Sequence, residues 1–123
     1  MLPRFKPYPQ KRQLRNVKII SVEPYGTGVS YRITFEWFNQ LDFKETTFLL
    51  FNTNEPDDKK RLEKLCSYAD VCDPLHLKGK LVRLAYYRDS FNGSSVPEKV
   101  GHIFENNFFR LTGEFKSNYF ELI

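Results

Sequence analysis

The segment 29–52 limits the possible folds of this chain more than any other, because apolar and polar residues alternate in it. Every second residue of its first half is apolar: Val29, Tyr31, Ile33, Phe35 and Trp37. Successive side chains of a strand point to opposite faces, so this period of two predicts one buried face and one solvent-facing face. The turn-forming residues 39–42 interrupt the pattern, and a second aromatic and β-branched run follows over 43–52. The two runs predict an antiparallel hairpin.

Residues 16–23 predict an earlier strand with an irregularity in it. Val17 and Ile19 fall on one face of such a strand, whereas Ile20 and Val22 fall on the other. A switch of the apolar face within one strand predicts a bulge or strong bend near Ile19, as when a strand curls to serve both halves of a barrel.

A single amphipathic helix is expected over residues 56–71. Asn54 is a suitable N-cap, Pro56 is tolerated in the first turn, and Asp57 and Arg61 have the spacing of a favourable ion pair. One apolar stripe recurs at helical spacing, formed by Leu62, Leu65, Cys66 and Ala69. The stripe predicts that the helix packs against the sheet and ends before the Asp-Pro pair at 73–74.

Two further strands are expected, over 77–88 and 101–111, with 88–99 as a polar loop or hairpin connection. The predicted order is therefore β-β-β-α-β-β, which is the order of a five-stranded OB-fold. The fold class expected is mainly β, a β-barrel with one helix. We expect residues 1–15 to form a basic extended arm, and 16–123 to form a single OB-like domain with a short, partly packed C-terminal tail.

The junction between the helix and the next strand carries a resemblance to a known family. A proline-containing loop there precedes a Leu-x-Gly-Lys-x-Val strand start at Leu77, Gly79, Lys80 and Val82. This arrangement resembles small phage and mobile-element OB-fold proteins that bind single-stranded DNA. The resemblance covers about a fifth of the chain and implies a DNA-binding barrel. The C-terminal segment 114–123 departs from the long acidic tail of the better-known bacterial single-strand binders, because it is short and mostly apolar.

Charge is concentrated at the N-terminus. Residues 1–18 hold six basic side chains and no acidic one, and subtracting these from the net charge of +4 leaves −2 for residues 19–123. A basic arm on a nearly neutral body is suited to phosphate, because each neutralised phosphate releases counterions. A solvated tail that only aids solubility is the alternative interpretation.

Other function classes find little support in the sequence. There is no apolar run of membrane-spanning length and no secretory signal, and two cysteines are too few for a disulfide scaffold, so we expect a cytoplasmic protein with no membrane partner. Neither His76 nor His102 lies in a catalytic motif, and the spacing of Cys66 and Cys72 is not that of a zinc knuckle. We therefore expect no enzyme activity, no metal and no cofactor.

The preferred hypothesis is a protein that binds single-stranded DNA or RNA through a basic, aromatic barrel face. Single-strand binders combine cations that follow the backbone with aromatic rings on which bases stack. Nine residues on the solvent-facing positions or the arm are the candidates: Arg12, Arg15, Arg32, Phe38, Lys44, Lys80, Arg83, Tyr87 and Arg88. Tyr25 and Phe91 lie in loops that are able to close over a strand. The alternatives are a phage- or plasmid-type adaptor or inhibitor that binds a protein partner, and a protein that self-associates.

Overall fold

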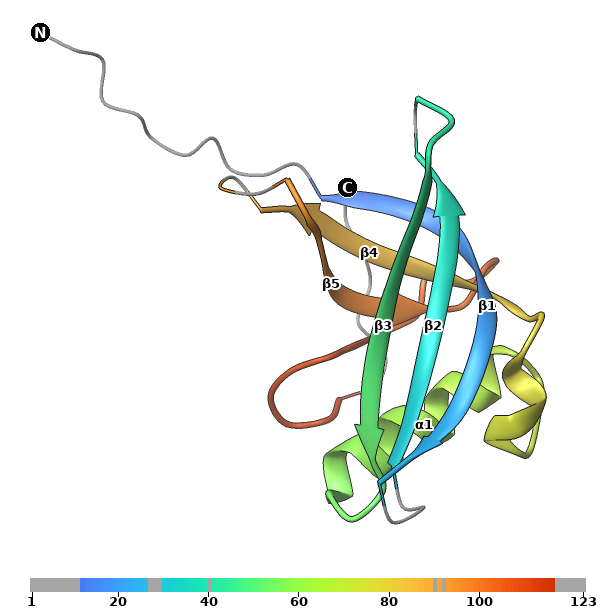
Figure 1. The fold of residues 1–123 in the computed structure, drawn as a ribbon. Helices are drawn as coiled ribbons and strands as arrows, with labels where there is room; N and C mark the ends of the chain where they lie inside the picture. The colour runs from blue at the N-terminus through green and yellow to red at the C-terminus, as the bar shows by residue number, and fades with distance from the viewer. Residues whose placement is uncertain (1–11, 27–29, 40, 90, 92, 117–123) are drawn as a thin grey trace, which may run out of the picture.

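The computed structural model describes residues 12–26, 30–39, 41–89, 91 and 93–116. Its elements are β1 (Gln13–Tyr25), β2 (Ser30–Phe38), β3 (Lys44–Asn52), α1 (Pro56–Tyr68), the 3₁₀ helix η1 (Pro74–Leu77), β4 (Leu81–Arg88), β5 (Ser95–Gly101) and β6 (Phe108–Arg110). The strands form one antiparallel sheet in the order β3-β2-β1-β4-β5-β6. Figure 1 shows that this sheet curls, so that β4 and β5 cross behind β2 and β3 while α1 lies across one end.

The mainly β class with one helix is confirmed as a curled half-barrel, but the expected number of five strands is wrong. The segment 88–99, expected as a polar connection, contains most of β5, and the strand expected over 101–111 is instead the end of β5 followed by β6. Pro97 and the polar residues around it concealed β5. The register between β4 and β5 shifts at Ala85 and Tyr86, and a proline is accommodated in a strand at such an irregularity.

The predicted irregularity in β1 is confirmed. The pairing of β1 with β2 changes register between Ile19 and Ser21. At that point the backbone of Ile19 bonds to the loop before β4: its N–H donates to the Lys80 carbonyl at 2.9 Å, and its carbonyl accepts from Gly79 N–H at 2.7 Å. The first half of β1 pairs with β4 and the second half with β2. The bulge therefore lies where β1 passes from one half of the sheet to the other.

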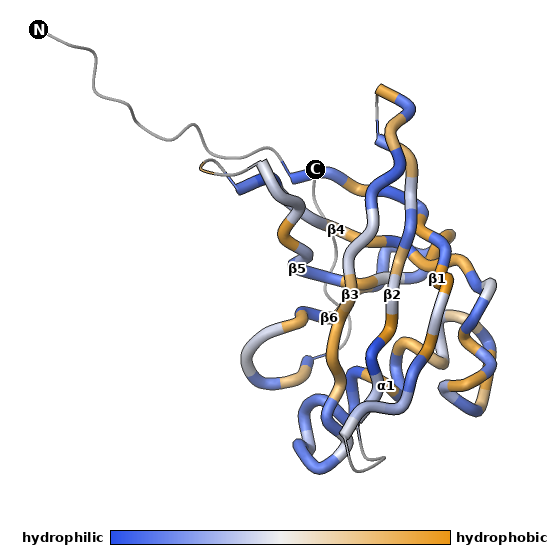
Figure 2. The backbone as a smooth tube through the Cα atoms, in the orientation of Figure 1, coloured by the Kyte–Doolittle hydropathy of each residue, from blue (hydrophilic) through white to orange (hydrophobic). Residues whose placement is uncertain are grey.

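The core occupies the space between the concave side of the sheet and α1. The alternation in β2 is confirmed, because Ile33, Phe35 and Trp37 are buried, while Val29 lies outside the described residues. The helix stripe is buried too, and it packs in the same cluster as the β2 residues. The rings of Trp37 and Tyr86 lie 5.1 Å apart, centroid to centroid. Figure 2 shows apolar residues on both α1 and the strands that face it.

Two local predictions for α1 are wrong. The N-cap is Glu55, without a side-chain hydrogen bond, whereas the Asn54 N–H bonds to the Asn52 side chain before the helix begins. Arg61 pairs with Asp58 at 2.8 Å, not with Asp57. Asp57 instead accepts from the Phe115 N–H at 3.1 Å. Both acidic side chains of the first turn are therefore used to attach neighbouring segments to the helix.

The two chain ends carry expectations that the described residues reach only in part. β1 begins at Gln13, so residues 13–15, which we expected in the basic arm, belong to the sheet. Residues 1–11 of the arm and 117–123 of the tail lie outside the described residues. No helix among the described residues is long and apolar enough to cross a membrane.

Candidate functional site

The convex side of β2 and β3 exposes aromatic and basic side chains together. Because alternate residues of β2 point into the core, the residues between them and their cross-strand partners on β3 face solvent. This surface, called the outer face below, consists of Arg32, Thr34, Glu36 and Phe38 of β2 and Lys44, Thr46, Phe48 and Leu50 of β3. Phe38 is 59% exposed and Phe48 is 52% exposed. Two large rings thus remain in water on a surface built from regular strand pairing.

Arg32 and Phe48 form a contact at the centre of the outer face. The guanidinium carbon of Arg32 lies 4.7 Å from the centroid of the Phe48 ring. Thr34 is the direct cross-strand partner of Phe48, so Arg32 reaches the ring as its diagonal neighbour. A guanidinium at this distance over a ring face is held by cation–π attraction. The pair combines a fixed positive charge with an exposed aromatic surface.

Acidic side chains partly neutralise the positive charge of the outer face. Lys44 Nζ lies 3.7 Å from a carboxylate oxygen of Glu36, and Glu23 of β1 stands opposite Arg32. The Lys44 side chain is 57% exposed, and an exposed ion pair of this kind contributes little, about 0–1 kcal/mol. An incoming anion can therefore replace Glu36 as the partner of Lys44 at small cost.

A cleft of about 570 Å³ follows the free edge of β3, beside the outer face. Its lining residues are mostly small and polar, and they are Thr34, Thr46, Thr47, Ser94 and Ser95, together with Arg32, Glu45 and Phe48. Glu45 joins the two sides of the cleft, because it accepts from Arg88 Nη2 and from Ser95 Oγ, each at 2.9 Å. Side chains, rather than a backbone ladder, therefore connect this end of β3 to the β4–β5 hairpin.

The loops next to the outer face also expose aromatic rings. Phe91 lies in the β4–β5 loop and is 98% exposed, and its N–H donates to the Asp89 side chain at 2.7 Å. Tyr25, at the end of β1, is 54% exposed and precedes Gly26, which has a φ of 68°. Phe91 is therefore an exposed loop residue as expected, whereas Tyr25, expected in a loop, is the last residue of β1 and pairs with Ser30.

The structure brings three of the nine predicted residues together on the outer face: Arg32, Phe38 and Lys44. Arg12 and Tyr87 line a separate cleft of about 250 Å³ at the β4–β5 side of the sheet, where Arg12 Nε lies 2.6 Å from a Glu98 oxygen. Lys99 and Arg110, which the sequence did not single out, line that cleft as well.

The other four predicted residues belong to neither group, although Arg88 reaches the cleft beside the outer face through its bond to Glu45. Arg83 donates to the Ile103 carbonyl in the β5–β6 loop, and Arg88 donates to Glu45 and to the Gly93 carbonyl. Lys80 is exposed in the loop before β4. Arg15 stands opposite Leu84 on the core side of the sheet, with a buried Nε. Arg83 and Arg88 therefore bind other parts of the fold.

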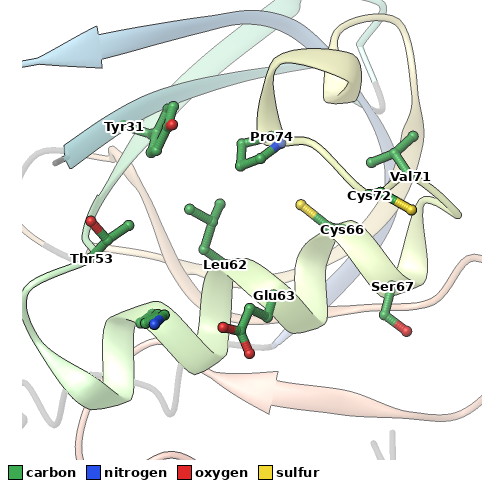
Figure 3. A pocket seen from close by; sticks show the side chains of 10 residues that line it. Tyr31, Thr53, Leu62, Glu63, Cys66, Ser67, Val71, Cys72 and Pro74 are labelled. Atoms are coloured by element: carbon green, nitrogen blue, oxygen red, sulfur yellow. The ribbon is translucent and has the colours of Figure 1, made fainter. Parts of the chain in front are cut away.

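A third hollow, of about 380 Å³, lies between α1, the start of β2 and η1. Figure 3 shows Leu62 and Cys66 of α1 pointing toward Tyr31 and Pro74 across it. Burial, and secondarily the negative charge of Asp73, raises the pKa of the Cys66 thiol to about 11. A thiol held protonated in this way is a poor nucleophile and metal ligand. No group of three or more potential metal ligands occurs in the part of the chain that the structure describes.

Sequence reasoning missed Phe48, the best-placed ring of the outer face. In β3 the residues that point to both faces are apolar: Phe48 and Leu50 point to one face, and Leu49 and Phe51 to the other. Alternation alone therefore does not tell which pair is buried. Pairing with β2 would have decided it, because Leu49 stands opposite the core residue Ile33.

Comparisons with protein-family models, curated proteins and solved structures found no match to this chain. The function must therefore be inferred from the outer face itself.

Proposed function

We propose that this chain binds single-stranded nucleic acid, in the first place DNA, on the outer face of β2 and β3, and that it is not an enzyme. The observation that carries the proposal is the exposed Arg32–Phe48 pair at 4.7 Å, with Phe38 and Lys44 further along the same two strands. Bases stack on exposed rings while cations follow the phosphates, and neither interaction requires a particular sequence. The outer face supplies both kinds of group on two fully paired strands.

The strand order supports the proposal. The strands are paired in the order β3-β2-β1-β4-β5, with the helix between β3 and β4, and this order is compatible with an OB-fold left open between β3 and β5. We propose that the half-barrel is such a fold with β6 added at one edge. OB-folds bind oligonucleotides on the face of their second and third strands and with the loops between strands one and two and between strands four and five. Here Phe91 lies in the second of these loops, and Tyr25 is the last strand residue before the first.

Anisotropy of a fluorescein-labelled oligo-dT tests the proposal better than protein fluorescence, because the single tryptophan, Trp37, is buried in the core. We expect binding at low salt that weakens steeply as salt is added. Phe48→Ala should weaken it about 5- to 150-fold, which corresponds to the loss of one stacked base at about 1–3 kcal/mol. Arg32→Ala should also reduce the salt slope by about 0.7, the value for one phosphate contact on a single strand.

Phe104→Ala is the matched control, because Phe104 is equally aromatic and 84% exposed but lies in the β5–β6 loop. It should bind oligo-dT as the unsubstituted protein does. The absence of binding at low salt with about 50 μM protein would refute the proposal, because even non-specific binders have dissociation constants of about 1–100 μM at physiological salt and bind more tightly at low salt. An oligo-dT affinity that is insensitive to salt would point instead to an aromatic surface for a protein partner, since such surfaces are rich in the same residues. An equal loss of oligo-dT affinity in Phe48→Ala and Phe104→Ala would point to the same alternative.

A further inference from the structure

The two edges of the sheet differ in how they are protected. β6 is three residues long, and its Phe108 and Phe109 are fully buried. β3 is nine residues long and pairs with β2 over its whole length without a register shift. Natural sheets protect long edges with proline, bulges, central lysines or a covering segment. β3 has no proline or bulge, and its only charged residues, Lys44 and Glu45, stand at one end.

The hairpin geometry shows which backbone groups of β3 point away from the sheet. Asn39 N–H donates to the Phe43 carbonyl at 2.9 Å, which fixes the phase of the ladder. With this phase, Glu45, Thr47, Leu49 and Phe51 direct their N–H and C=O groups to β2, and the residues between them direct theirs outward. Asn52 agrees with this phase, because its backbone bonds to the Asp58 side chain and the Glu55 N–H.

Three consecutive outward-directed residues, Thr46, Phe48 and Leu50, remain along the edge. Within the described residues, no hydrogen bond is found for their backbone groups. The cleft of about 570 Å³ lies along this same edge at Thr46 and Phe48. The side chains of Phe48 and Leu50 are about half exposed beside it. Such an edge offers hydrogen bonds to an extended strand, with apolar contacts on its flank.

We propose that the edge of β3 pairs with β3 of a second copy of this chain, antiparallel and centred on Phe48. In this register Thr46 stands opposite Leu50 of the second copy and Phe48 stands opposite its own equivalent. The three residue pairs exchange about six backbone hydrogen bonds, two in each pair. Lys44 then stands opposite Asn52, and Glu45 opposite Phe51, so no like charges meet across the edge.

The sequence of the edge favours a second copy over an unrelated strand. A two-fold interface uses the same residues twice, so each must suit its symmetry partner. Phe48 on Phe48 forms an aromatic pair, and Leu50 covers the β-branched side chain of Thr46, both of which are favourable cross-strand combinations. Asn52, which is already bonded to α1, marks one end of the available edge.

The dimer does not depend on nucleic-acid binding, but it has a consequence for it. Antiparallel strands of one sheet are related by a two-fold axis perpendicular to the sheet, so the outer faces of both copies would lie on the same side. If the proposed function holds, the two Arg32–Phe48 pairs then form one continuous surface across the junction.

Sedimentation equilibrium without nucleic acid tests the pairing, from about 10 to 500 μM because a single strand pair lies at the weak end of specific interfaces. We expect the mass to rise with concentration from 14.6 kDa toward twice that value. The double variant Thr46→Lys, Leu50→Lys places two lysines opposite each other and should stay monomeric. Thr46→Lys, Leu50→Glu places opposite charges there and should dimerise again. All four substituted positions in the two copies are on the surface, and circular dichroism checks that each variant is folded.

Amide exchange of the unsubstituted protein gives an independent result. The amides of Thr46, Phe48 and Leu50 should become slower to exchange as the concentration rises, while those of Thr47 and Leu49, bonded to β2, should be slow throughout. A protein that is monomeric up to 500 μM would overturn the pairing. Equal dimerisation of the two lysine-bearing variants would also overturn it. Neither result bears on oligo-dT binding by the monomer, so the failure of this inference is distinct from failure of the proposed function.

Discussion

Arg61 provides the sharpest test of what attaches the end of the described chain to the helix. Its side chain is 6% exposed, and its three nitrogen atoms all have partners. Nη1 bonds Asp58 at 2.8 Å, Nε bonds the Arg110 carbonyl at 2.9 Å, and Nη2 bonds the Gly113 carbonyl. One guanidinium on α1 therefore holds the end of β6 and the residues that follow it. Replacing it with methionine removes every one of these bonds and keeps most of the apolar stem.

The size of the effect follows from what each partner loses. A hydrogen bond to a charged group contributes about 1.5–3 kcal/mol, and breaking a fully buried ion pair costs about 3–5 kcal/mol. Asp58 is 24% exposed and keeps its bond from the Asn52 N–H, so water compensates part of the loss. We therefore expect Arg61→Met to lower the free energy of unfolding by about 2–4 kcal/mol. Arg61→Lys should cost less, because an ammonium retains the Asp58 contact but lacks the fork that reaches both carbonyls.

Urea unfolding, followed by the fluorescence of the buried Trp37, measures this loss directly. Lys60→Met is the matched control, since Lys60 is the exposed neighbour of Arg61 on the same helix. Its free energy of unfolding should change by no more than about 0.5 kcal/mol. If Arg61→Met falls within the same range as the control, the guanidinium does not hold the C-terminal segment and the reasoning is refuted.

Two further predictions concern the packing of β5 and α1. Gly101→Ala should lower the melting temperature, because a Cβ there would lie 2.8 Å from the Asn107 carbonyl oxygen and against the Phe108 ring. Such overpacking costs about 1–3 kcal/mol. An unchanged melting temperature in calorimetry would contradict this prediction. Burial raises the pKa of Cys66 from 9.0 to about 11, so between these pH values the folded thiol stays protonated while the unfolded one ionises, and the free energy of unfolding should fall as pH rises. In urea titrations at pH 8, 9 and 10, the free energy of unfolding of Cys66→Ala should fall less with pH than that of the unsubstituted protein. An equal dependence on pH in the two proteins would show that Cys66 is not the cause.

The elements that sequence reasoning predicted correctly are those whose own residues determine their environment. The alternation around Ile33 and Phe35 gave the buried face of β2, and the change of face near Ile19 gave the bulge in β1. The stripe along α1 gave its packing side. In each case apolar spacing within one segment carries the information, because strands and helices repeat at different periods.

Features that depend on residues distant in sequence could not be predicted in this way. β5 is polar and contains Pro97, and it becomes a strand because β4 and β6 flank it on both sides. Arg61 selects Asp58 rather than Asp57 because its remaining nitrogens must reach carbonyls about fifty residues later, at separations of 49 and 52 positions. Local spacing gives no indication of such partners.

The same limit applies to the candidate site. Solvent-facing alternation identified Arg32 and Phe38 correctly as members of one exposed face, whereas the hydrogen bonds of Arg83 and Arg88 depend on the β5–β6 loop and on Glu45. An arginine at a solvent-facing strand position is therefore not necessarily available to a ligand. Of the cations that the sequence suggested, the structure places Arg32 in contact with an exposed aromatic ring, that of Phe48.

β3 contributes to both proposals through different chemical groups. The stacking surface uses the Phe48 ring, whereas the pairing edge uses the backbone N–H and C=O groups of Thr46, Phe48 and Leu50. Alanine at position 48 removes the ring and leaves the backbone ladder, so it should weaken oligo-dT binding strongly, and it should weaken the dimer only by the loss of the Phe48–Phe48 pair. The paired lysines at positions 46 and 50 oppose the dimer and leave the Arg32–Phe48 contact in place, and because they add positive charge to the outer face, oligo-dT binding should be kept or strengthened. The two proposals for this strand can therefore be distinguished, because the Phe48 ring is central to stacking, whereas the main chain supplies the hydrogen bonds of the dimer.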